Sequence, residues 1–291
     1  MVIRKIEFGS FCFNAIIYLM IIIMLFTFLY PLYYVVIVSL SDGLSVMRGD
    51  IRWLPIGINF EAYRAVLDNP LVLRAYGNTI LYTVVGTFIN VMMTALCAYP
   101  LSRNRFYGRN VFTVFIIITM LFHGGLIPNY LVVYRLHMLN SIWAIVIPAA
   151  INVWNMIIMR TFFQNIPNEI YESAHMDGAH DMKIFLRIVL PLSMPVIATM
   201  CMFYAVAHWN SFFPATLYLS DSKLYPIQVI VRNYVIDGLV SSGSNAESDS
   251  KTIVTSMKYA FIFITLLPIL AVYPFIQKYF VKGVMVGSLK G

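Results

Sequence analysis

Six long stretches of this chain contain no charged residue, and they constrain its fold more than any other feature. They are residues 8–41, 75–102, 110–134, 136–159, 188–220 and 259–277. Apolar stretches of ~18 residues or more with few charges indicate membrane-spanning helices. We therefore predict an all-α polytopic membrane protein with one domain over residues 1–291. Its six spans are expected at about 11–38, 76–101, 111–128, 141–159, 193–213 and 258–277.

Composition agrees with a membrane protein and argues against a soluble one. Hydrophobic residues make up 60% of the chain and charged residues 11%, against roughly 45–50% and 25% in soluble domains. The net charge of +7 could suggest nucleic acid, but the charges are dispersed and no soluble basic domain carries them. The short loop 102–110 contains three arginines, which favours its placement inside the cell. The sequence thus predicts no nucleic-acid partner and cytoplasmic N- and C-termini.

The polar loop between the fourth and fifth spans, residues 160–191, has strong local signals. Pro167 resists continuation of a preceding helix, and Asn168 is a candidate N-cap. Glu169 and Glu172 follow in a first helical turn, where carboxylates suit the positive end of the helix dipole. Gly178 then breaks the helix, because glycine adopts left-handed backbone conformations readily.

A second short helix is expected after this glycine. Its apolar residues recur at helical spacing, at Met182, Phe185, Leu186 and Val189, and Pro191 is expected to end it. Two short helices joined at a sharp corner would form a rigid projection able to receive a push from a soluble partner. An ordinary amphipathic loop is the alternative interpretation.

The same loop resembles the EAA loop of bacterial binding-protein-dependent ABC importers. The matching pattern is Glu172-x-Ala174, three residues that include Asp177, Gly178, nine residues, and Ile188-x-Leu190-Pro191. Ser173 replaces the second alanine of the motif, a substitution of one small residue by another. The resemblance implies that this loop is the coupling helix that seats in a cleft of an ATPase subunit.

Two further stretches are similar to carbohydrate-importer permeases, in particular to those for alginate- and aldouronate-type oligosaccharides. They are Phe122–Val133 and Tyr273–Ser288. The resemblance implies the six-helix core of a type I importer, paired with a second homologous permease and two ATP-binding subunits in the bacterial cytoplasmic membrane. It also implies an extracytoplasmic sugar-binding protein. The outer loop 221–257, through residues 237–256, would enter that protein. The tail 278–291, through Lys282–Gly291, would reach between the ATPase subunits.

The chain lacks residue patterns for chemistry of its own. No Gly-x-x-x-x-Gly-Lys-Ser/Thr loop is present, so ATP and Mg²⁺ are expected on partner subunits and no cofactor on this chain. The five histidines are scattered without metal-ligand spacing. The three cysteines lie singly inside predicted spans, which suits neither a disulfide framework nor a metal site. We therefore predict a transport subunit that is not an enzyme and binds no metal.

Polar residues inside the predicted spans are candidates for a sugar path, because polar groups in hydrocarbon are costly. These candidates are Asn78, Tyr82, Asn90, Asn152, Asn155, His208, Trp209 and Asn210. Amides can bond sugar hydroxyls, and aromatic rings can cover the apolar faces of pyranose rings. Asn152 and Asn155 are three residues apart and would share one helical face. The alternative role for every member of the set is hydrogen bonding between helices.

The function expected from these features is import of an oligosaccharide delivered by a binding protein and driven by ATP. An acidic substrate such as alginate or aldouronate is the first expectation. A smaller neutral sugar, such as a maltose-type disaccharide, is the alternative within the family. A membrane-embedded enzyme or a stand-alone carrier is the alternative from another class. Either would need intramembrane acid, metal-ligand or nucleophile groupings that the sequence does not show.

Overall fold

A computed structural model describes residues 8–122, 124–241, 256–272 and 274, with side chains described from residue 13 and not over 237–241. These residues form helices, and they contain no β-strand. The chain divides into two compact units. Unit 1 contains Met1–Asn69 and Asn233–Leu267, and unit 2 contains Pro70–Arg232 and Pro268–Gly291. The division falls within α14 (Ile227–Ser241) and within the last described helix, Ser256–Val272.

Unit 1 is built around α1, Phe8–Ser39, which runs as one helix through Pro31. Much of α1 has no protein neighbour, since none of its most apolar window is buried. Such a helix suits lipid, where exposed apolar side chains carry no penalty. Two short helices follow, α2 (Gly43–Arg48) and α3 (Glu61–Leu67). Asn59 Oδ1 accepts a 2.7 Å hydrogen bond from the Glu61 amide at the start of α3.

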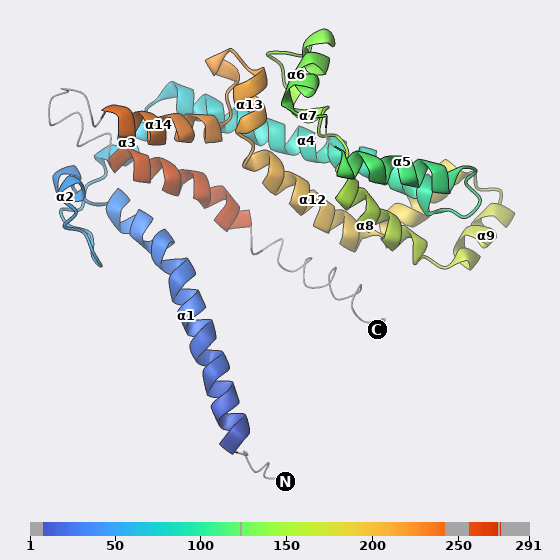
Figure 1. Ribbon diagram of the computed structural model, residues 1–291, viewed down its shortest axis with the longest axis horizontal. Helices are drawn as coiled ribbons and strands as arrows, with labels where there is room; N and C mark the ends of the chain where they lie inside the picture. The colour runs from blue at the N-terminus through green and yellow to red at the C-terminus, as the bar shows by residue number, and fades with distance from the viewer. Residues whose placement is uncertain (1–7, 123, 242–255, 273, 275–291) are drawn as a thin grey trace. The chain divides into compact units, whose positions relative to one another are not determined.

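Unit 2 has α4 as its longest helix, running without a break from Pro70 to Ser102. The helices that follow are α5 (Arg109–Leu121), α6 (Leu126–Arg135), α7 (Trp143–Val146), α8 (Val153–Gln164), α9 (Asn168–Met176), α10 (Asp181–Ile184), a π-helical turn (Phe185–Val189), α11 (Leu190–Leu192), α12 (Met194–Trp209), α13 (Phe213–Tyr218) and a 3₁₀ turn (Ser222–Leu224). Figure 1 shows α8 and α12 alongside α4, with which both pack.

Apolar cores at the two ends of α4 help to hold unit 2 together. The larger core lies between one end of α4, the helices α8 and α12, and the short helices of the 160–191 loop. Its buried members include Ala98, Met159, Phe163, Phe185 and Met200. The smaller core lies at the other end of α4, around Tyr82, Ile145, Ala215, Leu219 and Val229. The 160–191 loop is therefore packed into the helix bundle rather than lying loosely on it.

A glycine sets the distance between α4 and α12. A Cβ atom added at Gly86 would lie 2.4 Å from Nε2 of His208, well inside contact distance. The missing side chain lets His208 donate a 3.1 Å hydrogen bond from Nε2 to Asn90 Oδ1. Asn90 Nδ2 in turn donates to the Ala149 carbonyl oxygen at 2.6 Å. Close approach and a buried polar contact thus occur together at this crossing.

The prediction of membrane-spanning helices is confirmed for part of the chain. Two described helices, Phe13–Ser39 and Pro70–Ser102, are long and apolar enough to cross a membrane. Two bent pairs raise the number of candidate spans to four, α5 with α6 and Asp181–Leu192 with α12. The second pair bends by 82°. The prediction of six spans stays a prediction.

The predicted span 141–159 is divided rather than continuous. Residues 147–152 separate α7 from α8, and Pro148 stands within this break. Asn152 has extended backbone angles and caps α8, its Oδ1 accepting a 3.1 Å hydrogen bond from the Asn155 amide. The prediction that Asn152 and Asn155 share a helical face was therefore wrong, because only Asn155 lies inside the helix.

Candidate functional site: the 160–191 loop and its attachment to α4

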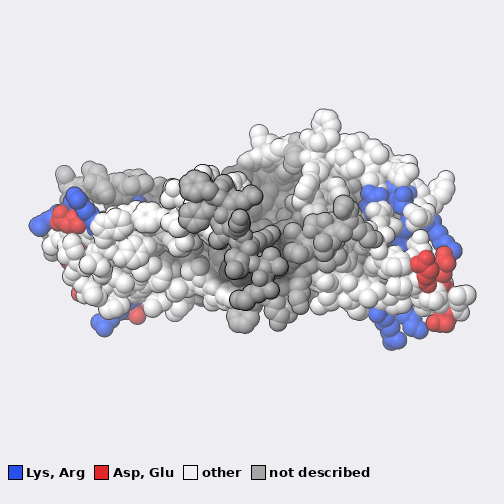
Figure 2. Space-filling model, turned by 90° about the horizontal axis from the view of Figure 1, so that it is seen from below, with Lys and Arg blue, Asp and Glu red and all other residues white. Residues whose placement is uncertain are grey.

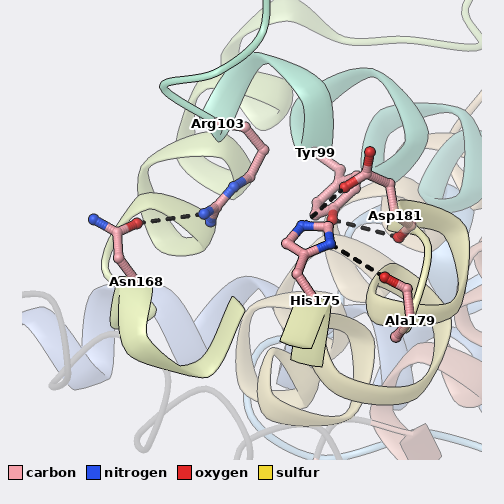
Figure 3. Close-up of polar contacts among 6 residues, drawn as sticks. All are labelled: Tyr99, Arg103, Asn168, His175, Ala179 and Asp181. Atoms are coloured by element: carbon pink, nitrogen blue, oxygen red, sulfur yellow. Dashed lines mark hydrogen bonds and ion pairs between the residues drawn. The ribbon is translucent and has the colours of Figure 1, made fainter. Parts of the chain in front are cut away.

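The corner predicted at Gly178 is present and has the geometry of a Schellman motif. Gly178 has φ +75°, in the left-handed region. Its amide donates to the His175 carbonyl oxygen at 3.0 Å, and the Ala179 amide donates to the Ala174 carbonyl oxygen at 3.0 Å. These two bonds satisfy carbonyl groups that the end of α9 would otherwise leave free. His175 also donates from Nδ1 to the Ala179 carbonyl oxygen at 3.1 Å (Figure 3).

The start of α9 differs from the prediction by one residue. Asn168 is the first residue of the helix, Pro167 occupies the cap position, and no side chain caps the end. The Asn168 side chain instead forms a hydrogen bond with a residue beside the end of α4. Its Oδ1 accepts a 3.3 Å hydrogen bond from Nη2 of Arg103, which follows the end of α4. Asn168 was wrongly predicted as an N-cap because a tertiary partner competes for its oxygen.

Arg103 clamps α9 against the end of α4. Its guanidinium carbon lies 3.2 Å from the centre of the Tyr171 ring, a close cation–π contact, while its Nη2 bonds Asn168. Burial raises the pKa of the Tyr171 phenol, although the charge of Arg103 opposes this shift. The ring therefore stays neutral at physiological pH, as a cation–π partner should. Cation–π contacts contribute about 0.5–2 kcal/mol.

Other contacts attach α10 and α8 to the same end of α4. The rings of Tyr99 and Phe185 lie 4.9 Å apart between centroids. The Tyr99 hydroxyl donates a long, 3.4 Å hydrogen bond to the Asp181 carbonyl oxygen (Figure 3). Arg160, on α8, donates from Nε to the Leu101 carbonyl oxygen at 2.9 Å. Several independent contacts thus attach the 160–191 loop to α4.

The second helix of the loop departs from the predicted pattern. A π-helical turn occupies Phe185–Val189, and such a turn inserts an extra residue that rotates the face presented to the core. Of the four apolar residues at helical spacing, Phe185 and Val189 are buried, whereas Met182 and Leu186 are each 51% exposed. Pro191 does not end the helix, because α11 continues to Leu192 and the 82° bend follows.

The loop presents a polar surface away from the core. Ala174 is buried beneath it, while Glu172, Ser173, Asp177 and Gly178 are exposed. Ile188 and Leu190 are half-buried, and Pro191 is exposed. Figure 2 shows two separate groups of charged side chains, and the group on the right lies where α9 and the start of α5 lie in Figure 1. The motif residues thus separate into those that pack inward and those that a partner can touch.

A cleft of about 600 Å³ lies between this loop and the turn that joins α4 to α5. Arg103, Arg105 and Phe106 line it from the turn, and Glu172 and Asp181 line it from the loop. His175 Nε2 lies 3.6 Å from Asp181 Oδ1, so a protonated imidazole would form an ion pair there. The cleft therefore offers both signs of charge beside an apolar floor.

The amides and rings predicted for a sugar path are mostly engaged with the protein itself. Asn78 Nδ2 donates to the Lys223 and Tyr225 carbonyl oxygens, and the Tyr82 hydroxyl donates to the Leu224 carbonyl oxygen at 2.7 Å. Asn90 and His208 bond one another. These four residues therefore hold α4 to α12 and to the segment 222–225.

The remaining members of the set differ among themselves. Asn155 is buried, and Asn152 uses its oxygen as a helix cap. Asn210 is exposed, and its Nδ2 donates to the Val206 carbonyl oxygen at 2.9 Å. Trp209 is buried, and its indole nitrogen has no hydrogen-bond partner. Trp209 is thus the member of the set whose polar atom the surrounding protein leaves unsatisfied.

Sequence analysis did not identify two residues of the loop's attachment. Arg103 is one of the three arginines of loop 102–110 that indicate membrane orientation, and Tyr171 belongs to no recognised motif. The signal that could have found Tyr171 is its spacing from Ala174, which places both on one face of α9. Nothing local in the sequence marks Arg103 as its partner. The outer loop 237–256 and the tail 278–291 lie outside the described residues, except for the ends of the loop.

Within the part of the chain that the structure describes, no three His, Cys, Asp or Glu residues are grouped so as to hold a metal ion. The expectation that this chain binds no metal or cofactor stays a prediction.

The family follows from comparison with known proteins. Residues 72–286 match the family described as "Binding-protein-dependent transport system inner membrane component". This chain belongs to that family. It is a membrane component of a transport system rather than an enzyme, as the resemblance of the 160–191 loop implied.

Individual relatives of this permease include two proteins of Bacillus subtilis (strain 168). The polygalacturonan/rhamnogalacturonan transport system permease protein YtcP is 41% identical over 90% of this chain and 92% of its own length. Protein LplC is 42% identical over 90% of this chain and 89% of its own. A solved structure of a bacterial ABC transporter involved in the import of the acidic polysaccharide alginate is 33% identical, with a TM-score of 0.86. It covers 94% of this chain and 98% of the matched chain.

Proposed function

We propose that this permease carries acidic oligosaccharides across the bacterial cytoplasmic membrane as half of an ATP-driven importer. Two relatives support an acidic substrate, one named for polygalacturonan and rhamnogalacturonan and one for alginate. The unit carried is an oligosaccharide that an extracytoplasmic binding protein delivers. Aldouronate-type fragments belong to the same chemical class and are included in the proposal.

The observation that carries the mechanism is the attachment of α9 to α4 through Arg103, Tyr171 and Asn168. Force applied to the exposed side of α9 passes into α4 at this point. Because α4 is one helix of 33 residues, a tilt at Ser102 also moves Asn90 and Tyr82 farther along it. ATP binding on a partner subunit would in this way reorient the helices that line the path.

Energetics explain why the attachment has several parts. Moving a two-state equilibrium from 1:99 to 99:1 requires about 5.5 kcal/mol of differential binding energy. A single cation–π contact contributes only about 0.5–2 kcal/mol, which is less than this free-energy difference. The Tyr99–Phe185 stack, the Arg160 hydrogen bond and the shared apolar core add to it. Loss of one contact should therefore uncouple the importer partly rather than completely.

The proposed assembly contains this chain, a second homologous permease, two ATP-binding subunits and the binding protein. ATP and Mg²⁺ bind the ATPase subunits. In the proposed topology six helices span the membrane, both termini are cytoplasmic, and Glu172, Ser173 and Asp177 face the ATPase with Gly178 at the corner. The outer loop 237–256 contacts the binding protein, and the tail 282–291 reaches the ATPase subunits.

Uptake by cells tests this proposal. A strain that lacks the chain should lose uptake of labelled galacturonate and alginate oligomers and regain it on complementation. An affinity tag on the chain should co-purify ATP-binding subunits. Preferential uptake of a neutral disaccharide would contradict the acidic substrate. Activity of the purified chain without an ATPase would contradict the importer itself and favour a stand-alone carrier.

A further inference from the structure

Four of the buried polar atoms in unit 2 that have no hydrogen-bond partner belong to α4 and to the end of α12. They are the hydroxyls of Tyr76, Thr83 and Thr87 and the indole nitrogen of Trp209. The first three belong to α4 at spacings of seven and four residues, which places them on one face of the helix. Trp209 ends α12, and its ring lies 6.4 Å from that of Tyr76. We call these four residues the unpaired stripe.

The stripe is energetically unusual. Each unsatisfied buried polar atom costs about 1–3 kcal/mol. Threonines in helices commonly donate to the carbonyl four residues earlier, as Thr79 does to Ala75 at 2.8 Å. Thr83 and Thr87 make no such bond. Three unsatisfied hydroxyls along about 16 Å of α4, with a fourth unsatisfied atom at the end of α12, indicate a surface whose partners are absent in this conformation.

A cavity of about 240 Å³ adjoins the stripe. Thr83 and Trp209 line it together with apolar residues of α4, α12 and the end of the last described helix, including Val84, Met202 and Ile269. In this conformation the wall is apolar, because the unpaired atoms themselves are buried. A small movement of α12 from α4 would open the space toward those atoms.

We propose that the unpaired stripe is the surface of this chain that contacts sugar rings during translocation. The inference rests on the proposed function and assigns residues to its path. The rings of Trp209 and Tyr76 would cover the apolar faces of pyranose units. The threonine hydroxyls and the indole N–H would pair with sugar hydroxyls. In one conformation the polar atoms of the stripe are buried, and in the other they would form hydrogen bonds with the sugar. The sugar would therefore interact differently with the two conformations, as alternating access requires.

The composition of the stripe also limits what it can select. It contains no charged side chain, so it recognises hydroxyls and ring faces rather than carboxylates. Uronate and neutral pyranose units should therefore pass along it equally well. Selection of acidic oligosaccharides is left to the binding protein or to other surfaces of the assembly.

Isosteric substitution separates this role from simple packing. Thr83→Val and Thr87→Val remove a hydroxyl and preserve side-chain shape, and Tyr76→Phe does the same for the phenol. A packing role predicts equal or higher thermal stability and unchanged uptake, because an unsatisfied group is removed. A sugar-contact role predicts uptake lowered by about three- to tenfold for each lost hydrogen bond, again without loss of stability. Thr161→Val is the control, since Thr161 is exposed and its hydroxyl donates to the Ile157 carbonyl oxygen.

The measurement uses the whole importer in proteoliposomes with its binding protein and labelled galacturonate oligomers. Lower uptake for Thr83→Val and Thr87→Val with an unchanged melting temperature supports the inference, and uptake equal to wild type overturns it. If the wild-type importer itself transports no oligosaccharide, the proposed function fails instead.

If Thr83→Val or Thr87→Val also lowers the melting temperature, thiol labelling provides an independent test of the sugar-contact role. Thr83→Cys and Thr87→Cys are introduced after replacement of Cys12, Cys97 and Cys201. Labelling by a water-soluble reagent in one nucleotide state, with protection by the oligosaccharide, supports the inference. Absence of labelling in every nucleotide state overturns it.

Discussion

At the residue scale, Arg103 and Gly178 determine how the 160–191 loop is held. Arg103 joins two residues of α9 to the end of α4, through a ring contact and a hydrogen bond. Gly178 lets α9 end in a left-handed turn from which α10 can depart. The first residue fixes the position of the loop, and the second fixes its shape.

Substitution of Gly178 tests the importance of the corner. A Cβ atom there would meet nothing within 4 Å, so the penalty comes from backbone strain alone. The left-handed conformation costs roughly 1–2 kcal/mol for an L-residue and more for a β-branched one. We expect Gly178→Val to abolish most uptake while the purified protein stays folded, as measured by transport and by circular dichroism.

Gly178→Asn is the matched control, because asparagine tolerates left-handed backbone angles. It should retain most of the wild-type uptake. Near-normal uptake by Gly178→Val would show that the shape of the corner is not needed for coupling.

At the element scale, α4 is the connection between the loop and the rest of unit 2. It packs against α8 and α12 along its length and receives the clamp at its end. Its close approach to α12 depends on Gly86. The same crossing contains the Asn90–His208 hydrogen bond. The distance between α4 and α12 therefore determines both how the two helices pack and whether the Asn90–His208 hydrogen bond can form.

Gly86→Ala should force α4 and α12 apart. The added methyl group would lie 2.4 Å from the His208 ring, and relief requires backbone movement or loss of the hydrogen bond to Asn90. We expect a loss of stability of about 1–3 kcal/mol from this overpacking, measured by thermal unfolding of the detergent-purified importer. Gly77→Ala on the same helix is the control, since nothing lies within 4 Å of it.

Equal melting temperatures for the two alanine variants would contradict a tight α4–α12 contact. The control should be neutral or slightly stabilising, because alanine is the better helix former.

Sequence patterns predicted the elements that depend on local signals. Pro167 and Gly178 correctly marked the beginning and end of α9. The π-helical turn and the role of Asn168 were not predictable, because they depend on Arg103 and on the core beneath the loop. The amide side chains were predicted to line the sugar path, yet most of them form hydrogen bonds within the protein. These partners come from distant parts of the sequence or from local capping, so they are visible only in the folded structure.

At the scale of the whole molecule, this permease is proposed to be one part of an importer whose energy comes from other subunits. Its family assigns it to the membrane component of a binding-protein-dependent system. Its tail and outer loop are proposed to reach the other parts of that assembly. Substitutions in this chain are therefore expected to disturb communication between subunits as well as folding.

Deletion of residues 284–291 should produce such a defect. The segment is too short to fold alone and is proposed to lie between the ATPase subunits. We expect weaker stimulation of ATP hydrolysis by the loaded binding protein, with assembly of the subunits intact. Stimulation equal to wild type would show that the tail is a solvated end without a partner.

The most direct test of coupling through Arg103 is the number of oligosaccharides transported per ATP hydrolysed in proteoliposomes. Arg103→Met removes the contacts to Tyr171 and Asn168, whereas Arg105→Met changes an exposed arginine of the same turn and serves as the control. We predict a lower ratio of oligosaccharide transported to ATP hydrolysed for Arg103→Met, with basal ATP hydrolysis retained, and a wild-type ratio for Arg105→Met. A wild-type ratio for Arg103→Met would contradict transmission through this clamp.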